Sequence, residues 1–215
     1  GFSEVSLDLI YGTPGETDDQ WQQSLHDALA AEPTHVSAYS LIVEQGTKMA
    51  RLVKSGVLEP TDDDVLARRY EWADEAFRQA GLTWYEVSNW ARGGPNGFSM
   101  CRHNLGYWRN DDWLGIGAGA HSHVAGLRWW NHKHPARCSA QVMAGELPVA
   151  DFERLTSSEQ AVEEVMLRLR LAEGLPVDRI ASQHRADVDR LVSEGLLSPA
   201  DAAAGLLVLT PRGRL

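Results

Sequence analysis

Short runs of β-branched residues alternate with amphipathic segments over the first 90 residues, and this alternation restricts the possible folds more than any other feature. Residues 4–12 and 34–43 are rich in apolar and β-branched side chains and predict strands. Between them, Thr17 and Gln20 have the spacing of a capping box in front of an amphipathic helix. This order predicts two parallel strands in one sheet, joined by a right-handed crossover.

The chain then continues the same alternation. Residues 60–80 predict a long helix that begins at a cap formed by Thr61 and Asp64. Gly81 ends this helix, and residues 82–90 predict a third strand. The sequence therefore predicts an α/β fold with a parallel sheet, in which ligand sites gather at the carboxyl ends of the strands. Several charged residues of the long helix are spaced for its solvated face, namely Arg68, Arg69, Glu71 and Glu75.

Asp8 lies in the middle of the first predicted strand, whose apolar composition indicates burial on both faces. A carboxylate in such a strand is costly unless it is paired or hydrogen-bonded. The residue chemistry leaves two alternatives open. Asp8 pairs inside the fold, or it points into the mouth of a barrel and holds a ligand.

Residues 101–122 concentrate side chains that can bind a ligand. They include two imidazoles, three flat aromatic rings and three glycines that allow close backbone approach, namely His103, His121, Tyr107, Trp108, Trp113, Gly115, Gly117 and Gly119. The loop composition of residues 91–98 predicts that residues 101–110 reach the carboxyl side of the third strand. The alternative is that these rings form a structural plug and that the glycines only bend a strand.

Residues 122–131 predict a hairpin that turns at Ala125 and Gly126, and residues 135–148 predict a short helix. His132 and His134 have a spacing that suits metal ligation from one face of a strand. No third ligand stands at a matching distance in the sequence, so a zinc site is not predicted.

Residues 149–155 predict a linker, which divides the chain into a first domain at 1–148 and a second at 149–215. The second domain begins with a helix capped by Thr156 and Glu159 and continues with two short helices at 177–183 and 187–193. A strand at residues 206–210 is expected to form a small hairpin with residues 196–198. Three helices and a small hairpin are typical of a winged-helix-like domain.

Composition limits the classes of function. The net charge of −10 and the few basic residues on the candidate recognition helix disfavour nucleic-acid binding. No apolar run approaches the roughly 18 residues that a membrane helix needs. Cys101 and Cys138 form no CxxC pair, which indicates a reducing, cytoplasmic setting. The chain begins without an initiator methionine and ends just after a turn signal, so we expect it to be part of a longer protein.

Five segments carry a resemblance to one family. They are DLIYGTPGET (8–17), HVSAYSLIVEQGT (35–47), YEVSNWA (85–91), CRHNLGYW (101–108) and LGIGAGAHS (114–122). Together they resemble the oxygen-independent coproporphyrinogen III oxidase-like radical-SAM proteins, and the HNxxYW motif is similar to that of the HemW-type haem chaperone branch. The resemblance implies that residues 1–148 are the later part of a partial (β/α) barrel and that a small helical, winged-helix-like domain follows.

A closed barrel needs eight βα units and roughly 250 residues. We therefore expect residues 1–131 to form an open, incomplete parallel sheet of about three strands. The first strand would then have a bare edge.

The resemblance also implies that the intact protein binds a [4Fe-4S] cluster and S-adenosylmethionine. In the family a CxxxCxxC loop holds the cluster, and this sequence lacks that loop, so we expect the chain alone to bind no cluster and to be catalytically inactive. Asp8 matches the strand aspartate that contacts S-adenosylmethionine, and Ile42 and His121 lie in segments that approach this cofactor. The resemblance assigns neither a catalytic residue nor a metal ligand to this chain.

For haem, the resemblance implies that His103 coordinates the iron axially and that Asn104 fixes the loop. Tyr107 and Trp108 would flank the macrocycle. The expected function is the binding of haem and its delivery to haem-receiving proteins. The alternative is the oxidative decarboxylation of coproporphyrinogen III in porphyrin biosynthesis, and a third class is an accessory domain without a ligand. A homodimer and a transient membrane association of the intact protein are compatible with this family.

Overall fold

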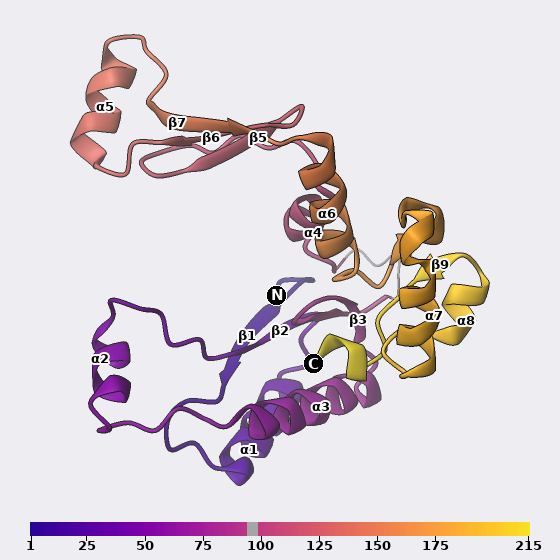
Figure 1. Cartoon of the computed structure of the whole chain (residues 1–215). Helices are drawn as coiled ribbons and strands as arrows, with labels where there is room; N and C mark the ends of the chain where they lie inside the picture. Colours follow the sequence, from indigo (N-terminus) through magenta and orange to yellow (C-terminus); the bar gives the residue numbers. More distant parts are fainter. Residues whose placement is uncertain (94–98) are drawn as a thin grey trace.

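The computed structural model describes residues 1–93 and 99–215, so part of the predicted loop at 91–98 lies outside the described residues. The chain forms an open sheet, a second sheet and a helical unit (Figure 1). The first sheet has the order β1–β2–β4–β3 and consists of β1 (Ser6–Tyr11), β2 (His35–Ser40), β3 (Thr83–Glu86) and β4 (Asn89–Ala91). The helices of this part are α1 (Asp18–Ala30), α2 (Lys48–Lys54), α3 (Asp63–Gln79) and α4 (Arg102–Arg109).

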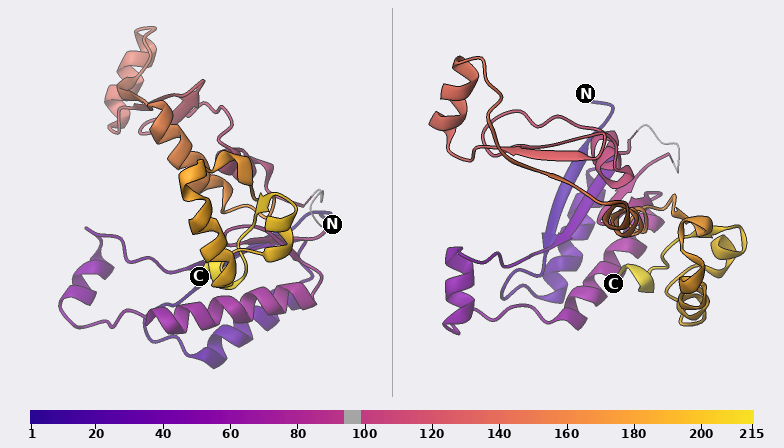
Figure 2. Two further views of the ribbon diagram at one scale, coloured as in Figure 1. Left: turned by 45° about the vertical axis from the view of Figure 1, so that its right-hand side comes forward. Right: turned by 45° about the horizontal axis from the view of Figure 1, so that its top comes forward.

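The second sheet is antiparallel and consists of β5 (His121–Val124), β6 (Leu127–Asn131) and β7 (Val149–Arg154), with α5 (Pro135–Met143) between β6 and β7. The helical unit contains α6 (Ser157–Arg168), α7 (Arg185–Ser193), α8 (Pro199–Ala203), the short strands β8 (Leu175–Pro176) and β9 (Leu206–Leu207), and 3-10 turns at Val177–Arg179, Ser182–His184 and Arg212–Arg214. The second sheet and α5 extend away from the first sheet (Figures 1 and 2). Contacts between α4 and α6 lie at the junction.

The predicted strand, helix and strand at the start of the chain are confirmed. β1 and β2 pair in parallel, with Asp8 opposite Ser37. The capping box also forms, because the Gln20 amide donates to the Thr17 hydroxyl at 3.2 Å and the Gln20 side chain accepts from the Thr17 amide at 2.9 Å. These local signals fix where α1 begins.

On one face of the first sheet α4 packs, among the described residues, only against β3 and β4, while the other face is covered by two helices. α1 and α3 lie against this face (Figure 1), and the core between them contains Trp21, Val36, Ala38, Phe77 and Trp90. On the opposite face the side chain of Asp8 is exposed. The prediction that the first strand is buried on both faces is therefore wrong. β1 lies at the edge of a sheet that does not close, as the prediction of an open sheet required.

The predicted third strand is a hairpin instead. β3 and β4 are antiparallel and turn sharply at Val87 and Ser88, where Ser88 has a φ of 72°. β4 also pairs antiparallel with β2, so that Ala91 lies opposite His35. The expectation of a purely parallel sheet is thus wrong. As a consequence, the chain leaves β4 at the amino ends of β1 and β2, and not at their carboxyl ends.

The prediction that Arg69 lies on the solvated face of its helix is also wrong, because this residue is only 2% exposed. Its guanidinium pairs with Glu16 at 2.7 Å and with Asp18 at 3.0 Å, on the turn and first residues of α1. The cap of α3 also differs from the prediction. Asp62 caps the helix by accepting from the Asp64 amide, while the Thr61 hydroxyl donates to the carbonyl of Gly12.

The hairpin predicted at residues 122–131 is confirmed, with positive φ at both Ala125 and Gly126. Residues 149–155 are not a linker, because β7 pairs with β6 across the expected domain boundary. Of the three predicted helices in the helical unit, the first and the one at 187–193 are present as α6 and α7. The predicted helix at 177–183 is instead two 3-10 turns, and α8 was not predicted. β9 pairs with β8, and the predicted pairing with residues 196–198 is reduced to one bridge between Leu197 and Leu209. None of the described helices combines the length and hydropathy needed to cross a bilayer.

Candidate functional site

The HNxxYW motif lies on helix α4 and not on a loop as predicted. The helix begins after Cys101 and ends at Asn110, whose φ of 61° is left-handed. Leu105 is buried against Tyr85, Ala91 and Leu171 and fixes one side of the helix to β3 and β4. The loop prediction failed because glycine and polar residues dominate the composition of this segment, whereas its helical character depends on this one buried contact.

His103 and Tyr107 form an exposed aromatic pair on the outer face of α4. They are four residues apart and therefore lie one above the other, with ring centroids 4.6 Å apart and an edge-on angle of 74°. The ring of Trp113 meets Tyr107 edge-on at 4.9 Å and also contacts His123 at 4.8 Å. No residue that the structure describes forms a hydrogen bond with the His103 ring, so its nitrogens can bind an external group.

Asn104 and Trp108 project from a different face of the same helix. Trp108 is half-buried and packs against the cluster around Tyr85 and Leu171, and the guanidinium of Arg170 lies 5.4 Å from its ring. Asn104 is also half-buried. The four motif residues therefore divide into an outer pair and an inner pair.

Glu86, at the end of β3, is a carboxylic acid that is 1% exposed. Burial raises the pKa of Glu86 to about 8, and the hydrogen bond from Asn89 opposes this rise. The Asn89 amide donates to one carboxyl oxygen. The other oxygen, Oε2, lacks a well-formed hydrogen bond to any described residue. Sequence reasoning missed Glu86, although it also stands within a predicted strand and the argument applied to Asp8 would have identified it.

A cavity of about 380 Å³ lies at the amino ends of β1 and β2, and residues from both predicted sites line it. Asp8 faces this space and accepts a hydrogen bond from the Ser37 hydroxyl at 2.5 Å. Asn104 and Cys101 line the cavity from α4, and Asn89 lines it from β4. The structure therefore brings Asp8 and Asn104 to one polar cavity, 96 positions apart in sequence.

His35 forms the floor of the same cavity and is itself held on both sides. Its ring nitrogens lie 2.8 Å from the Ser6 hydroxyl and 2.8 Å from the Tyr85 hydroxyl. Burial lowers the pKa of His35, and the negative charge of Asp8 acts in the opposite direction. The Tyr85 hydroxyl also accepts from the Cys101 amide at 3.1 Å, which ties the start of α4 to this network.

Ile42 and His121 do not line this cavity. Ile42 follows β2 and is 72% exposed, while His121 begins β5 and stacks on Trp130 at 5.7 Å. Of the three residues expected near S-adenosylmethionine, only Asp8 has the polar surroundings that suit such a ligand, so the fit is partial. The described residues contain no group of three His, Cys, Asp or Glu side chains that could hold a metal. We therefore assign no cluster chemistry to them.

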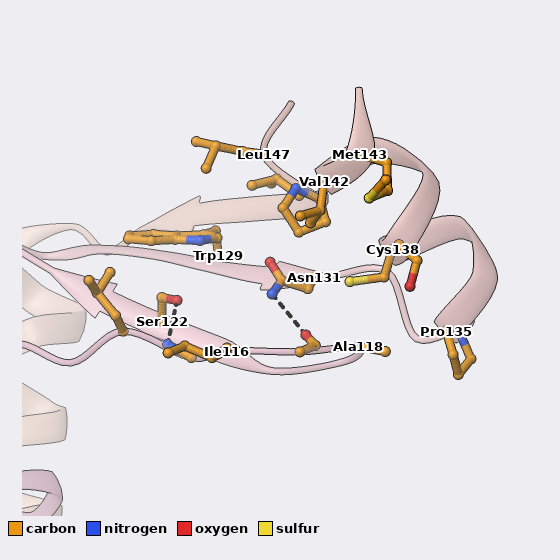
Figure 3. A pocket seen from close by; sticks show the side chains of 16 residues that line it. Ile116, Ala118, Ser122, Trp129, Asn131, Pro135, Cys138, Val142, Met143 and Leu147 are labelled. Carbon is orange, nitrogen blue, oxygen red and sulfur yellow. Dashed lines mark hydrogen bonds between the residues drawn. The ribbon is translucent and has the colours of Figure 1, made fainter. Parts of the chain in front are cut away.

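A larger and mostly apolar cavity of about 570 Å³ lies between α5, β6 and the segment before β5 (Figure 3). Ile116, Trp129 and Val142 contribute to its walls. Its glycine-rich wall has a structural reason, because a Cβ on Gly115 would lie 2.0 Å from the carbonyl oxygen of His121. None of the predicted haem residues lines this cavity.

Comparisons with known proteins bear on the family of the chain. The family described as HemN C-terminal domain matches residues 155–215. The haem chaperone HemW of Mycobacterium tuberculosis is 50% identical over 216 residues, which cover 100% of this chain and 53% of that protein. The haem chaperone HemW of Bacillus subtilis is 33% identical over 224 residues, which cover 100% of this chain and 57% of that protein. The chain thus spans about half the length of these relatives.

A relative that matches a shorter stretch is the mitochondrial radical S-adenosyl methionine domain-containing protein 1 of Danio rerio, which is 38% identical over 117 residues, or 54% of this chain and 26% of that protein. Among solved structures, coproporphyrinogen III oxidase (HemN) from Escherichia coli, described as a radical SAM enzyme, superposes with a TM-score of 0.73. It shares 19% identity, and the match covers 100% of this chain and 53% of that one. This likeness concerns the fold.

Proposed function

Because the chain belongs to the coproporphyrinogen III oxidase-like radical-SAM family, in its HemW-type branch, we propose that it carries the haem-binding surface of a haem delivery protein. The observation that supports this proposal is the exposed pair of His103 and Tyr107 on α4. A neutral imidazole is a common axial ligand of haem iron, and a tyrosine ring one turn away can contact the macrocycle.

The division of the motif refines the roles of its four residues. In this proposal His103 binds the iron and Tyr107 contacts the macrocycle, supported at its edge by Trp113. Trp108 and Asn104 act from the inner side and hold the helix. Trp108 is packed in a cluster with Tyr85, and for this reason we do not assign it a stacking contact with haem.

The exposure of the outer pair suits delivery better than permanent storage. A haem held by one imidazole at a surface keeps most of its own surface accessible, so a receiving protein can approach it before the iron–nitrogen bond breaks. The chemical identity of the receiving protein then depends on the axial ligands that it offers. Delivery to such a protein is the step that separates this function from simple haem binding.

The proposal for the cofactors is narrower. Asp8 would contact S-adenosylmethionine, whose cationic sulfonium and ammonium groups suit a carboxylate at the edge of a polar cavity. When bound together with a [4Fe-4S] cluster, S-adenosylmethionine supplies radical chemistry. Ile42 and His121 remain predicted contacts. The alternative function, oxidation of coproporphyrinogen III, is supported by the fold likeness alone, and we do not develop it.

We also propose that the protein acts in the cytoplasm, because Cys101 and Cys138 are both free thiols. The bare edge of β1 offers unpaired backbone groups that a second strand can bind, which is the support for a homodimer in this proposal.

Transfer of haem to an acceptor tests the proposed function. The chain is loaded with one equivalent of haem, separated from free haem and mixed with haem-free myoglobin. We expect the Soret band of the loaded chain to move to that of the globin. The chain carrying His103→Ala should retain little haem after the same separation from free haem. Absence of any Soret band in the loaded chain would reject haem binding, and a stable band that never moves would reject delivery.

A further inference from the structure

The hydroxyl of Tyr85 joins the start of helix α4 to the first sheet. Tyr85 lies on β3 and is 2% exposed. Its hydroxyl accepts a hydrogen bond from the amide of Cys101 at 3.1 Å and lies 2.8 Å from Nε2 of His35 on β2. Nδ1 of His35 in turn lies 2.8 Å from the hydroxyl of Ser6 on β1. A continuous chain of hydrogen bonds therefore connects the start of α4 to β3, β2 and β1.

The chemistry of these groups fixes the direction of the chain. A tyrosine hydroxyl carries one proton, and a neutral imidazole has one donor and one acceptor nitrogen. Because the Tyr85 oxygen already accepts from the Cys101 amide, its own proton is available to Nε2 of His35. Nδ1 of His35 then carries the ring proton and donates to Ser6. This assignment gives the buried hydroxyl and both ring nitrogens a partner, as buried polar groups require.

α4 depends on such an attachment because it has little stability of its own. It has only 8 residues, and its N-cap Cys101 makes no side-chain capping bond. Isolated helices shorter than about 12 residues are marginal in water, so tertiary contacts must hold the helix. Leu105 shares a buried apolar cluster with the Tyr85 ring. Within the part of the chain that the structure describes, the hydroxyl of Tyr85 also makes the one hydrogen bond from outside α4 to residues 101–105.

His103 stands two positions after Cys101 and therefore lies in the turn that this hydrogen bond holds. We propose that Tyr85 is a positioning residue of the haem surface: its hydroxyl holds the amide of Cys101 and so fixes the turn of α4 that presents His103 to solvent. His35 supports Tyr85 by accepting the hydroxyl proton, which leaves the oxygen lone pairs free for the amide. The inference rests on the proposed haem function, and the buried Tyr85 does not itself touch haem.

Tyr85→Phe separates the hydroxyl from the ring, because it keeps the ring in its cluster and removes only the oxygen. We expect this variant to bind haem about three- to tenfold more weakly, which corresponds to the loss of one hydrogen bond. Its Soret band should also shift or broaden, because the imidazole of His103 is no longer held in one orientation. The amide of Cys101 should exchange its hydrogen faster than in the wild-type chain, which NMR measures at that single residue.

Substitutions of His35 test the second link of the chain. In His35→Gln the side-chain amide can accept the Tyr85 proton in place of Nε2, so this variant should keep the wild-type affinity and Soret band. His35→Leu cannot accept the proton and should weaken haem binding as Tyr85→Phe does. Because both groups act through one chain, the double variant should lose less affinity than the product of the two single losses. Full multiplication of the two losses would contradict the shared chain.

Tyr70→Phe is the matched control, because Tyr70 is also a buried tyrosine but belongs to the separate cluster around Trp90. It should leave haem affinity and the Soret band unchanged. Wild-type affinity and spectrum in Tyr85→Phe would overturn the inference, as would an equal loss in Tyr70→Phe. Circular dichroism checks that each variant is folded, and if Tyr85→Phe is not, His35→Leu decides with the Tyr85 ring intact. If His103→Ala also binds haem normally, the proposed function itself fails, so the two failures are distinguishable.

Discussion

The guanidinium of Arg214 pairs with the carboxylate of Asp74 at 3.1 Å, although 140 positions separate them in sequence. The same guanidinium lies 4.2 Å from the centroid of the Trp84 ring. The ion pair is mostly buried, with 5% of the Arg214 side chain and 19% of the Asp74 side chain exposed. It fastens the 3-10 turn at Arg212–Arg214 to α3 and β3.

Removal of this contact should destabilise the chain. In Arg214→Ala the carboxylate of Asp74 loses its buried partner, which should lower the free energy of unfolding by roughly 3 kcal/mol. Urea denaturation measures the effect. Arg190→Ala serves as the control because its pair with Glu194 is exposed, and it should change stability by less than about 0.5 kcal/mol. Similar losses in both variants would contradict this account.

Arg69 gives a second stability prediction. Its side chain is 3% exposed and joins Glu16 and Asp18 to α3, so Arg69→Ala leaves the less exposed partner, Glu16, without its ion pair. We expect a loss of roughly 3 kcal/mol in the free energy of unfolding. Arg78→Ala on the same helix breaks only an exposed pair with Glu75 and should be nearly neutral. An equally mild effect of Arg69→Ala would show that its burial is unimportant.

Glu86 makes stability depend on pH. Its pKa rises from 4.5 in the unfolded chain to about 8 in the fold, so the folded state binds more protons between these values. The free energy of unfolding should therefore fall as pH rises from about 5 to 8, by at most about 1.4 kcal/mol per pH unit. Below pH 4.5 Glu86 should cause no further change in stability with pH. Denaturant titrations at several pH values should show a flatter profile for Glu86→Gln. A parallel profile in the two proteins would contradict the raised pKa.

Gly115 and Gly106 should respond oppositely to alanine. In Gly115→Ala the new Cβ would meet the backbone carbonyl of His121 at 2.0 Å, so the segment must move and stability should fall by about 1–3 kcal/mol. In Gly106→Ala the nearest atom, Asp111 Oδ2, is 3.4 Å away, and the substitution should stabilise α4 by about 0.5–1 kcal/mol. Thermal unfolding tests both, and a stabilising Gly115→Ala would refute the close approach.

Local signals made the correct part of the fold predictable. The capping boxes at Thr17 and Thr156 depend only on residues three positions away, and Ala125 and Gly126 turn a hairpin whose strands adjoin them. Parallel pairing of β1 with β2 followed from the intervening helix. In each case the interaction that determines the structure is encoded within a short stretch of sequence.

The errors arise where the structure of a residue depends on contacts with residues that are distant in sequence or on a turn without the usual turn residues. Arg69 is buried because Glu16 and Asp18 reach it from about 50 positions away, which helix periodicity cannot reveal. The turn at Val87 and Ser88 lacks the glycine or asparagine that usually announces a tight hairpin, so one strand was predicted instead of two.

The candidate site was predictable only in part for a similar reason. The motif itself could be identified from residues 103–108. Its division into outer and inner pairs depends on α4 being a helix and on the burial of Leu105 against Tyr85 and Leu171, which are distant from the motif in sequence.

The central claim is that His103 is the haem ligand of this chain, and a haem titration of three histidine variants tests it most directly. His103→Ala should weaken haem binding by roughly 1 to 3 kcal/mol, or about five- to hundredfold, and should shift the Soret band. His132→Ala and His134→Ala should bind haem like the wild-type chain, because neither histidine adjoins the exposed aromatic pair on α4. An unchanged affinity and an unchanged Soret band in His103→Ala would contradict the claim.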